Sequence, residues 1–275
     1  MSEFEIRKMT SAIGAEIHGV DLSQPLSRAT LDAIEQALLD NMILLFRGQD
    51  ITPEQQLAFG RNFGDVYCPS MAAYVPEHPE IMLLDATAPR GAGADSWHYD
   101  ATFMTEPPMA CVLRPVQLPK SGGDTCYANM VAAYEALSPA LRSMLDGMTA
   151  VHDLTPQLRI ALDLGVSPED FETIQKKWPP IEHPVVRTHP VTGRKALFLN
   201  KVTGSRLVGL TDRENDLLQP FLLDHVQAAE FQCRVRWEPD CVAFWDNRCT
   251  QHCGVPDYTE RRVMHRVTIA GDKPR

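Results

Sequence analysis

The sequence lacks the features that mark membrane, secreted and nucleic-acid-binding proteins. No apolar run approaches the ~20 residues that a bilayer-spanning helix needs. Residues 1–5 have neither the basic region nor the apolar stretch of a signal peptide. Acidic side chains outnumber basic ones 36 to 26, giving a net charge of −10, whereas nucleic-acid binding needs clustered positive charge. We therefore expect a cytoplasmic protein that binds neither nucleic acid nor membranes.

Paired cysteines are also missing. The seven cysteines form an odd set without a CxxC motif, which indicates reduced thiols and not a disulfide or cysteine-metal framework. Cys249 and Cys253 are expected to be small packing residues. Repeats and low-complexity tracts are absent, and a hydrophobic content of 44% is ordinary for a globular protein. The 275 residues are expected to form a single domain, residues 1–275.

Helix signals recur along the chain. Residues 52–55 (Thr-Pro-Glu-Gln) form a capping box with proline in the first turn, which predicts a helix that ends near Gly64. Residues 138–139 (Ser-Pro) and 211–214 (Thr-Asp-Arg-Glu) predict two more helix starts. Apolar residues at helical spacing over 31–38 predict a fourth helix.

Short apolar runs between these helices predict strands. They lie at 42–46, 81–84, 109–113, 185–188, 196–199, 233–237, 241–245 and 263–270. Turn residues at 190–193 join two runs as a hairpin, and those at 238–240 are expected to join two more. Many short strands without regular helix alternation predict a mainly β protein with flanking helices, an antiparallel sandwich or jelly roll.

Residues 153–182 show no clear helix or strand pattern, because they carry four prolines, scattered charges and only weak periodicity. A long irregular insertion in a compact domain is usually a lid or a binding loop. A surface excursion with one short helix fits the same pattern. We regard the segment as a lid insertion and keep the excursion as the alternative.

The first chemically informative cluster is His98 and Asp100. Two positions apart on an extended strand, their side chains point to one face. An imidazole and a carboxylate on one face are two of the three ligands of a 2-His-1-carboxylate Fe(II) site, which leaves open positions for substrate and O2. Such pairs are common without metal, so a third ligand is needed; His252 is the leading candidate and His189 the competitor.

Two arginines follow His252 in the last predicted strand. Arg262 and Arg266 are separated by an even number of positions, so they project from the same face of that strand. Two inward guanidinium groups are costly unless an anion neutralises them, and a dicarboxylate cosubstrate would pair with them in bidentate fashion. Acidic residues of the protein could serve instead. Asp240, Asp246 and Asp257 are all near enough in sequence to do so.

With these residues in view, the sequence resembles the taurine/2,4-dichlorophenoxyacetate dioxygenase family of Fe(II)- and 2-oxoglutarate-dependent oxygenases. The similarity runs from residues 13–17 to 271–274. The segments that carry it are 97–103, 122–125, 186–190, 245–248 with His252, and 262–266. Five blocks in the same order are far more specific than one His-x-Asp pair.

The resemblance implies a fold and a metal site. The fold would be a double-stranded β-helix, a jelly roll whose two sheets enclose the iron. His98, Asp100 and His252 would be the catalytic Fe(II) ligands. The implied reaction couples O2 and the oxidative decarboxylation of 2-oxoglutarate to hydroxylation of a substrate C–H bond. If that carbon bears a sulfonate, sulfate or ether oxygen, the product should fragment to a carbonyl compound.

The resemblance also assigns the organic ligands. Thr125 and Arg262 would bind carboxylate groups of 2-oxoglutarate, and Arg266 would lie near the anionic group of the substrate. The substrate residues depart from those of taurine-specific members, because no histidine follows the Phe-Gly-Asp segment at 63–65 and no amide side chain lies at 94–96. Taurine itself is therefore disfavoured.

An anionic substrate with a bulkier hydrophobic body fits these changes better: an alkylsulfonate, a sulfate ester or an aryloxyalkanoate. Tyr67, Met71 and Tyr74 would contact that body, although they could instead pack a subunit contact of the expected homo-oligomer, a dimer or tetramer. Other possibilities are the same oxygenase chemistry on a neutral or amino-acid-like metabolite, or a zinc hydrolase. A catalytically silent jelly roll that binds a small anion is a further possibility.

Overall fold

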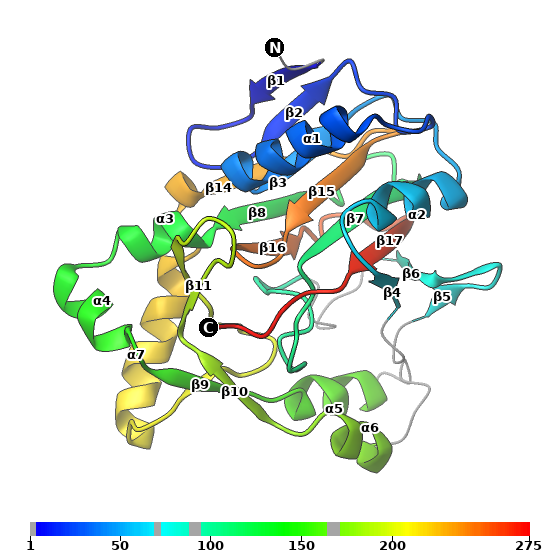
Figure 1. Ribbon diagram of the computed structural model, residues 1–275. Helices are drawn as coiled ribbons and strands as arrows, with labels where there is room; N and C mark the ends of the chain where they lie inside the picture. Colours follow the sequence, from blue (N-terminus) through cyan, green and yellow to red (C-terminus); the bar gives the residue numbers. More distant parts are fainter. Residues whose placement is uncertain (1–3, 69–72, 88–94, 164–170) are drawn as a thin grey trace.

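The computed structural model describes the chain except for four short segments (Figure 1). The described residues are 4–68, 73–87, 95–163 and 171–275. The described strands are β1 (Glu5–Lys8), β2 (Ala15–His18), β3 (Ile43–Phe46), β4 (Val66–Tyr67), β5 (Tyr74–Val75), β6 (His78–Thr87), β7 (Ala110–Gln117), β8 (Thr125–Asn129), β9 (Thr149–His152), β10 (Ile181–Pro184), β11 (Val186–Thr188), β12 (Lys195–Leu197), β13 (Arg206–Leu207), β14 (Gln232–Val235), β15 (Val242–Asp246), β16 (Thr250–Gly254) and β17 (Arg261–Ile269). The described helices are α1 (Arg28–Asn41), α2 (Pro53–Arg61), α3 (Met130–Glu135), α4 (Pro139–Leu145), α5 (Thr155–Asp163), α6 (Phe171–Lys177) and α7 (Asp212–His225).

The protein is mainly β-sheet with flanking helices, as the sequence predicts. The largest sheet in the described part of the chain has nine strands, in the order β1-β2-β3-β15-β7-β17-β6-β5, with β4 paired to β17. The β17–β7 ladder skips Val116, which forms a bulge beside Pro115. The β17–β6 ladder is unbroken, so side chains still alternate along β17.

The large sheet is covered by apolar groups on both faces. On one face α1 and α2 pack against it (Figure 1), and Phe59 of α2 contacts Phe46 and Phe244 edge-on at centroid distances of 5.8 and 5.5 Å. On the other face, Leu45 and Trp245 join a second core with the smaller sheets. Near-continuous apolar strands such as β3 and β15 follow from burial on both faces.

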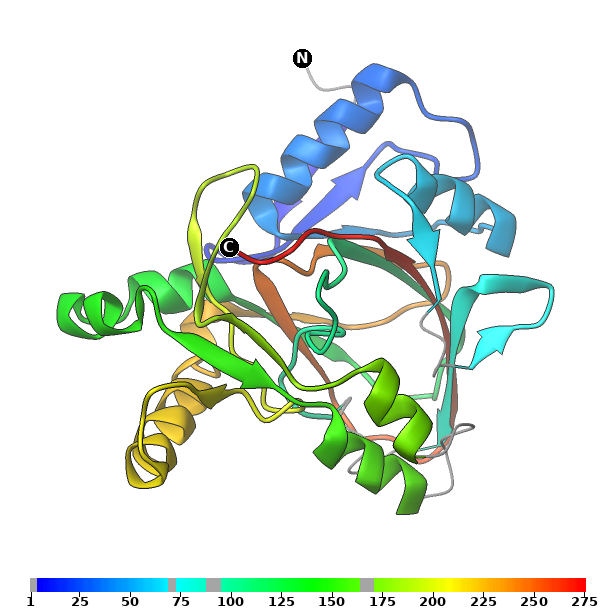
Figure 2. The same cartoon turned by 60° about the horizontal axis from the view of Figure 1, so that its bottom comes forward.

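Smaller sheets form the second layer. Strands β14, β8 and β16 make one, β10, β9 and β13 another, and β11 and β12 a hairpin. Tyr127 of β8 contacts Trp245 across the core, with the two rings tilted and their centroids 5.6 Å apart. Figure 2 shows these strands facing the large sheet across the interior of the molecule, with α4 and α7 outside them.

Local sequence signals are confirmed where they depend on neighbouring residues alone. Thr52 and Thr211 each cap a helix through a complete capping box. The turn at 190–193 joins β11 and β12 as predicted. The predicted hairpin at 238–240 is wrong, because β14 pairs with β8 whereas β15 pairs with β3 and β7. That turn carries the chain from one layer to the other, with Asp240 left-handed at φ 58°.

The segment 153–182 contains two helices, α5 and α6, and is not the irregular insertion, or the excursion with one short helix, that its composition indicated. Residues 164–170 within it lie outside the described part. The two helices meet through a small apolar cluster of Leu154, Leu158 and Ile174. Phe103 and Trp178 cover this cluster, with their rings edge-on at 5.4 Å. The helices therefore rest on the loop that follows Asp100.

The cysteines lie in the described part of the chain and none of the seven forms a disulfide. Cys249 is buried in the core, as expected of a packing residue, and Cys253 is half-buried. Among the described residues, none of the helices combines the length and the hydropathy that a bilayer-spanning segment requires.

Candidate functional site

The structure brings together the three predicted iron ligands, which come from two distant parts of the chain. The backbones of His98 and His252 form an isolated antiparallel bridge, with N–H···O distances of 3.0 and 2.9 Å. The expected extended strand over these residues is wrong, because Asp100 lies in the turn that follows His98. Its Oδ1 is 4.0 Å from Nε2 of His98 and its Oδ2 is 3.9 Å from Nε2 of His252. The three candidate ligand atoms lie within 4.8 Å of one another, as one small metal ion requires.

The protonation of the two histidines suits a metal ligand. Nδ1 of His98 lies 2.7 Å from the carbonyl oxygen of Ser96, so Nδ1 carries the proton and Nε2 offers its lone pair. Burial lowers the pKa of His98, and burial together with His98 lowers the pKa of His252 to about 3. Both rings are therefore neutral at physiological pH, the form that binds a divalent cation.

Asp100 supplies the negative charge. Burial by itself would raise the pKa of this carboxyl group, but the Arg266 guanidinium outweighs burial and holds the pKa well below its usual range. Nη1 of Arg266 donates to Oδ1 at 2.7 Å, and the Cys111 thiol lies 3.4 Å from Oδ2. Asp100 is thus an ionised carboxylate with oxygen lone pairs still available to a metal.

Arg262 and Thr125 present unused hydrogen-bond donors beside this centre. Nε of Arg262 is buried and has no hydrogen-bond partner within the described ranges. The Thr125 hydroxyl accepts a hydrogen bond from the Trp237 indole at 3.0 Å, which leaves its own proton to donate. A guanidinium with a buried, unpartnered Nε and a hydroxyl donor are the groups that a carboxylate ligand would satisfy.

The glycines before Thr125 are explained by close packing. Both have positive φ, +78° for Gly122 and +73° for Gly123. A Cβ on Gly122 would lie 2.5 Å from Oδ1 of Asp257, and one on Gly123 would lie 3.0 Å from Cδ of Arg262. The glycine pair therefore lets the chain approach the arginine side chain.

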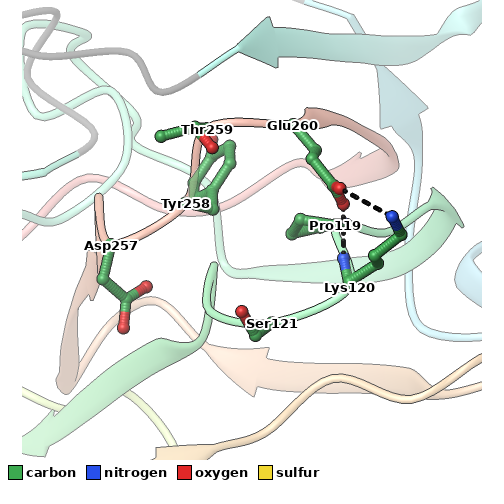
Figure 3. Close-up of a pocket in the computed structure, with 7 residues that line it drawn as sticks. All are labelled: Pro119, Lys120, Ser121, Asp257, Tyr258, Thr259 and Glu260. Atoms are coloured by element: carbon green, nitrogen blue, oxygen red, sulfur yellow. Dashed lines mark hydrogen bonds and ion pairs between the residues drawn. The ribbon is translucent and has the colours of Figure 1, made fainter.

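A pocket of about 240 Å³ lies beside this glycine turn (Figure 3). Its walls are residues 119–121 and 257–260, and an ion pair between Lys120 and Glu260 spans one side. The residues that line it include none of the candidate metal, cosubstrate or substrate ligands. This surface hollow is therefore not where the chemistry is expected.

The predicted substrate residues are placed differently from one another. Tyr67 is half-buried on β4, with its hydroxyl 3.6 Å from Sδ of Met104, and burial raises its pKa. It lines a second pocket, of about 450 Å³, together with Trp178. Tyr74 is exposed at the sheet edge on β5, and Met71 lies outside the described residues.

Arg266 lies on the same sheet face as Arg262, as strand parity predicts, whereas His265 projects to the opposite face beside Arg114. The acidic residues proposed as alternative partners for the two arginines are used elsewhere or not in contact with them. Asp246 binds Arg248 through both carboxylate oxygens and His189 through Oδ2 at 2.9 Å. His189 thus belongs to this buried ion group and not to the His98 cluster.

Sequence reasoning missed three side chains that complete the site. Sδ of Met82 accepts from Nη2 of Arg266 at 2.9 Å, Cys111 contacts Asp100, and Trp237 donates to Thr125. Each lies on a predicted strand, but the partner comes from a neighbouring strand or the facing layer. Alternation along one strand carries no information about those neighbours.

Comparison with known proteins places the chain in a family. The family model described as "Taurine catabolism dioxygenase TauD, TfdA family" matches residues 5–268. An alpha-ketoglutarate-dependent sulfate ester dioxygenase of Pseudomonas putida is 38% identical, covering 99% of this chain and 91% of that protein. An alkylsulfatase of Acinetobacter baylyi is 36% identical, with 98% and 86% covered.

A solved structure agrees with these sequence relatives. The crystal structure of a taurine dioxygenase from Burkholderia xenovorans superposes with a TM-score of 0.84 at 35% identity, covering 99% of this chain and 92% of the other. Alpha-ketoglutarate is 2-oxoglutarate, the cosubstrate that the arginines of the last strand suggested. The chain belongs to the TauD/TfdA family of 2-oxoglutarate-dependent dioxygenases.

Proposed function

We propose that this dioxygenase uses Fe(II), 2-oxoglutarate and O2 to hydroxylate the carbon that bears the sulfate group of an alkyl sulfate ester. Alkylsulfonates and aryloxyalkanoates are the next candidates. Arg266 carries the proposal, because it is a cation with a side chain only 11% exposed that directly contacts the carboxylate of the candidate metal site. The names of the two similar proteins support a sulfate ester.

The residues present fit the metal and the cosubstrate. His98, Asp100 and His252 would hold Fe(II), since two neutral imidazoles and one carboxylate are the donor set of such sites. When bound, Fe(II) supplies the O2 activation that couples decarboxylation of 2-oxoglutarate to hydroxylation of a C–H bond. Arg262 and Thr125 orient a carboxylate of 2-oxoglutarate through their unused donors.

Arg266 positions the substrate. Two of its N–H groups are used by Asp100 and Met82, and Nε has no hydrogen-bond partner in the described part of the chain. The remaining donors suit a sulfate oxygen. Tyr67 and Trp178 would contact the hydrocarbon body. Hydroxylation at the sulfate-bearing carbon gives an unstable hemiacetal ester, in which the C–O bond to sulfate breaks, leaving an aldehyde and hydrogen sulfate.

The same proposal includes the finer fold and the lid. The two facing layers would form a double-stranded β-helix around the site, and residues 153–182 would act as a lid over the loop that carries Phe103. A dimer or tetramer stays a prediction of the sequence, which light scattering on the purified protein tests.

Anaerobic addition of Fe(II) and 2-oxoglutarate tests the metal and cosubstrate assignments. We expect the weak visible charge-transfer band of the chelate in the wild type, its loss in His98→Ala, and a weaker affinity for 2-oxoglutarate in Arg262→Met. A band that persists in His98→Ala would show that the metal binds elsewhere.

Succinate release screened across alkyl sulfates, sulfonates, aryloxy acids and neutral analogues tests the substrate class. We expect an alkyl sulfate to give the highest kcat/KM and Arg266→Met to raise KM at least tenfold, about the loss of one charge-assisted hydrogen bond. Stimulation by neutral compounds alone would contradict the role of Arg266. Sulfate release with Zn²⁺ and without 2-oxoglutarate would indicate the zinc hydrolase instead.

A further inference from the structure

We propose that Asn247 is a positioning residue for the metal site, which holds the backbone of Asp100 so that its carboxylate faces the two histidines. The inference rests on the proposed metal site and adds a role for the residue after β15. Asp100 needs such support because it lies in a turn and not in a strand, followed by Ala101 with φ of 50°.

Asn247 pairs with the peptide groups of Asp100 in both directions. The N–H of Asp100 donates to Oδ1 of Asn247 at 2.9 Å, and Nδ2 of Asn247 donates to the carbonyl oxygen of Asp100 at 3.2 Å. The same Nδ2 donates to the carbonyl oxygen of Pro108 at 3.1 Å. One peptide N–H and two carbonyl oxygens determine the orientation of the Asn247 side-chain amide, that is, the positions of its Oδ1 and Nδ2. The reason is that an N–H can only donate and a carbonyl can only accept.

These bonds close the loop that carries the ligand. Asp100 and Pro108 are the two ends of a loop whose middle includes Phe103, the contact of the α5–α6 segment, and Met104, which lines the larger pocket. Asn247 thus ties together the ligand, the pocket wall and the support of the proposed lid. The side chain is fully buried, so water does not compete for these bonds.

Asn247 is itself fixed in place by a backbone hydrogen bond and by an ion pair between its two sequence neighbours. Its backbone N–H donates to the carbonyl oxygen of Met109 at 2.8 Å. The preceding residue, Asp246, binds the following one, Arg248, through a buried bidentate ion pair with distances of 2.8 and 2.6 Å. The Asp-Asn-Arg segment therefore forms a rigid base from which the amide reaches Asp100.

Partners that orient a metal ligand usually change metal affinity by 10–100-fold when they are mutated. Asn247→Asp keeps the side-chain shape and the acceptor for the Asp100 N–H, but it places a carboxylate oxygen against the two carbonyl oxygens. Asn247→Ala removes all three bonds. We expect both variants to bind metal about 10–100-fold more weakly.

Asn215 provides a matched control. It is buried and makes the same two-way pairing, accepting from the N–H of Leu207 at 2.9 Å and donating to its carbonyl oxygen at 3.0 Å. It lies on α7, outside the candidate site. Asn215→Asp should cost stability like Asn247→Asp and leave metal affinity unchanged within twofold.

The experiment is anaerobic titration of the full chain with Co(II), followed by the visible absorption of the bound ion, without 2-oxoglutarate or substrate. Circular dichroism and thermal unfolding of each variant measure folding separately. Weaker Co(II) binding with an altered spectrum in folded Asn247→Asp or Asn247→Ala, and unchanged binding in Asn215→Asp, is the expected result.

Three other outcomes overturn the inference in different ways. In the first, the wild type binds Co(II), His98→Ala does not, and both folded Asn247 variants bind Co(II) as tightly as the wild type. That result overturns the role of Asn247 alone. A wild-type chain that binds no Co(II), or binds it equally in His98→Ala, overturns this role together with the proposed metal site. Equal weakening in Asn215→Asp would show that the effect is general destabilisation.

Discussion

Two groups of buried charge lie close together at the candidate site and have different roles. Asp100 is paired with Arg266 at the candidate metal site, whereas Asp246, next to Asn247 in the sequence, is paired with Arg248 and His189. Both carboxylates are buried, and in both cases neighbouring donors outweigh burial and lower the pKa. The Asp100 carboxylate has oxygen lone pairs open toward two histidines, so it can bind a metal ion. The oxygens of Asp246 are occupied by donors of the protein, so this carboxylate has a structural role.

Removing Arg248 should therefore be costly. In Arg248→Met the Asp246 carboxylate stays buried without its bidentate partner, and we expect a loss of about 3–5 kcal/mol in the free energy of unfolding, measured by urea denaturation. Arg234, half-exposed and paired with Asp124, is the control. Arg234→Met should cost less than about 1 kcal/mol. Equal losses in the two variants would contradict the argument.

His152 makes stability depend on pH. It is fully buried beside His183, with Nδ1 3.2 Å from Oγ1 of Thr203, and burial lowers its pKa to about 3. Below a pH of about 6.5 the unfolded chain binds a proton there and the folded chain does not, so stability present at pH 7 is lost as pH falls toward 3. Between pH 6.5 and 5 this histidine should account for about 2 kcal/mol.

Urea unfolding at a series of pH values measures this dependence. His152→Gln should flatten the curve between pH 6.5 and 5 relative to the wild type, whatever its effect on stability at pH 8. A slope that is the same in both proteins would show that other groups are responsible.

At the scale of elements, the helices differ in how they are stabilised. Helices α1 and α2 pack on the large sheet and share the apolar core on that face, whereas α5 and α6 meet through a small separate cluster under Phe103 and Trp178. Elements with few buried apolar contacts open locally before the whole protein unfolds. The α5–α6 unit has the properties that a lid needs: its own small core and a position over the loop after Asp100.

Trp178→Ala should loosen this unit alone. Its ring contacts Phe103 at 5.4 Å and lines the larger pocket, so we expect faster hydrogen exchange in α5 and α6 and little change in the main thermal transition. Hydrogen exchange read by mass spectrometry measures both helices and, as an internal control, α1. Equal loss of protection in α1 would contradict independent opening.

At the scale of the whole molecule, the two apolar cores lie on opposite faces of one sheet and the C-terminal segment joins distant parts of the chain. Gly271 approaches the loop before β7 so closely that a Cβ would lie 2.0 Å from the carbonyl oxygen of Pro107. Farther on, Asp272 pairs with the buried guanidinium of Arg187, and the carbonyl oxygen of Arg275 accepts from the N–H of Thr188. The last residues thus hold β11 and the loop from Asp100 together.

Gly271→Ala should destabilise the whole protein by at least about 2 kcal/mol, because the backbone on both sides must move to admit the new methyl group. Gly193 is the control: it has φ of +69° but no atom within 4 Å of a built Cβ. Gly193→Ala should cost only about 1 kcal/mol, the penalty of the left-handed conformation. Thermal unfolding compares the two, and a smaller loss for Gly271→Ala would contradict the packing argument.

The sequence predicted what depends on neighbouring residues. Capping boxes at Thr52 and Thr211 act over three residues, and the turn at 190–193 acts over four, so each formed as expected. The turn at 238–240 looked the same locally but joins two different sheets. Which strand β14 or β15 pairs with depends on residues far along the chain, and no turn signal contains that information.

For the site, the sequence by itself determined the types of donor and the shared face of Arg262 and Arg266, which are four positions apart on one strand. Strand alternation does not explain His98 and Asp100, because Asp100 lies in a turn. Tertiary structure determined which of these residues come into contact. It joined His98 to His252, placed Arg266 on Asp100 from 166 positions away, and set Asn247 against the Asp100 peptide. The physical reason is that side-chain alternation is a property of one strand, whereas pairing between strands is a property of the whole packed chain.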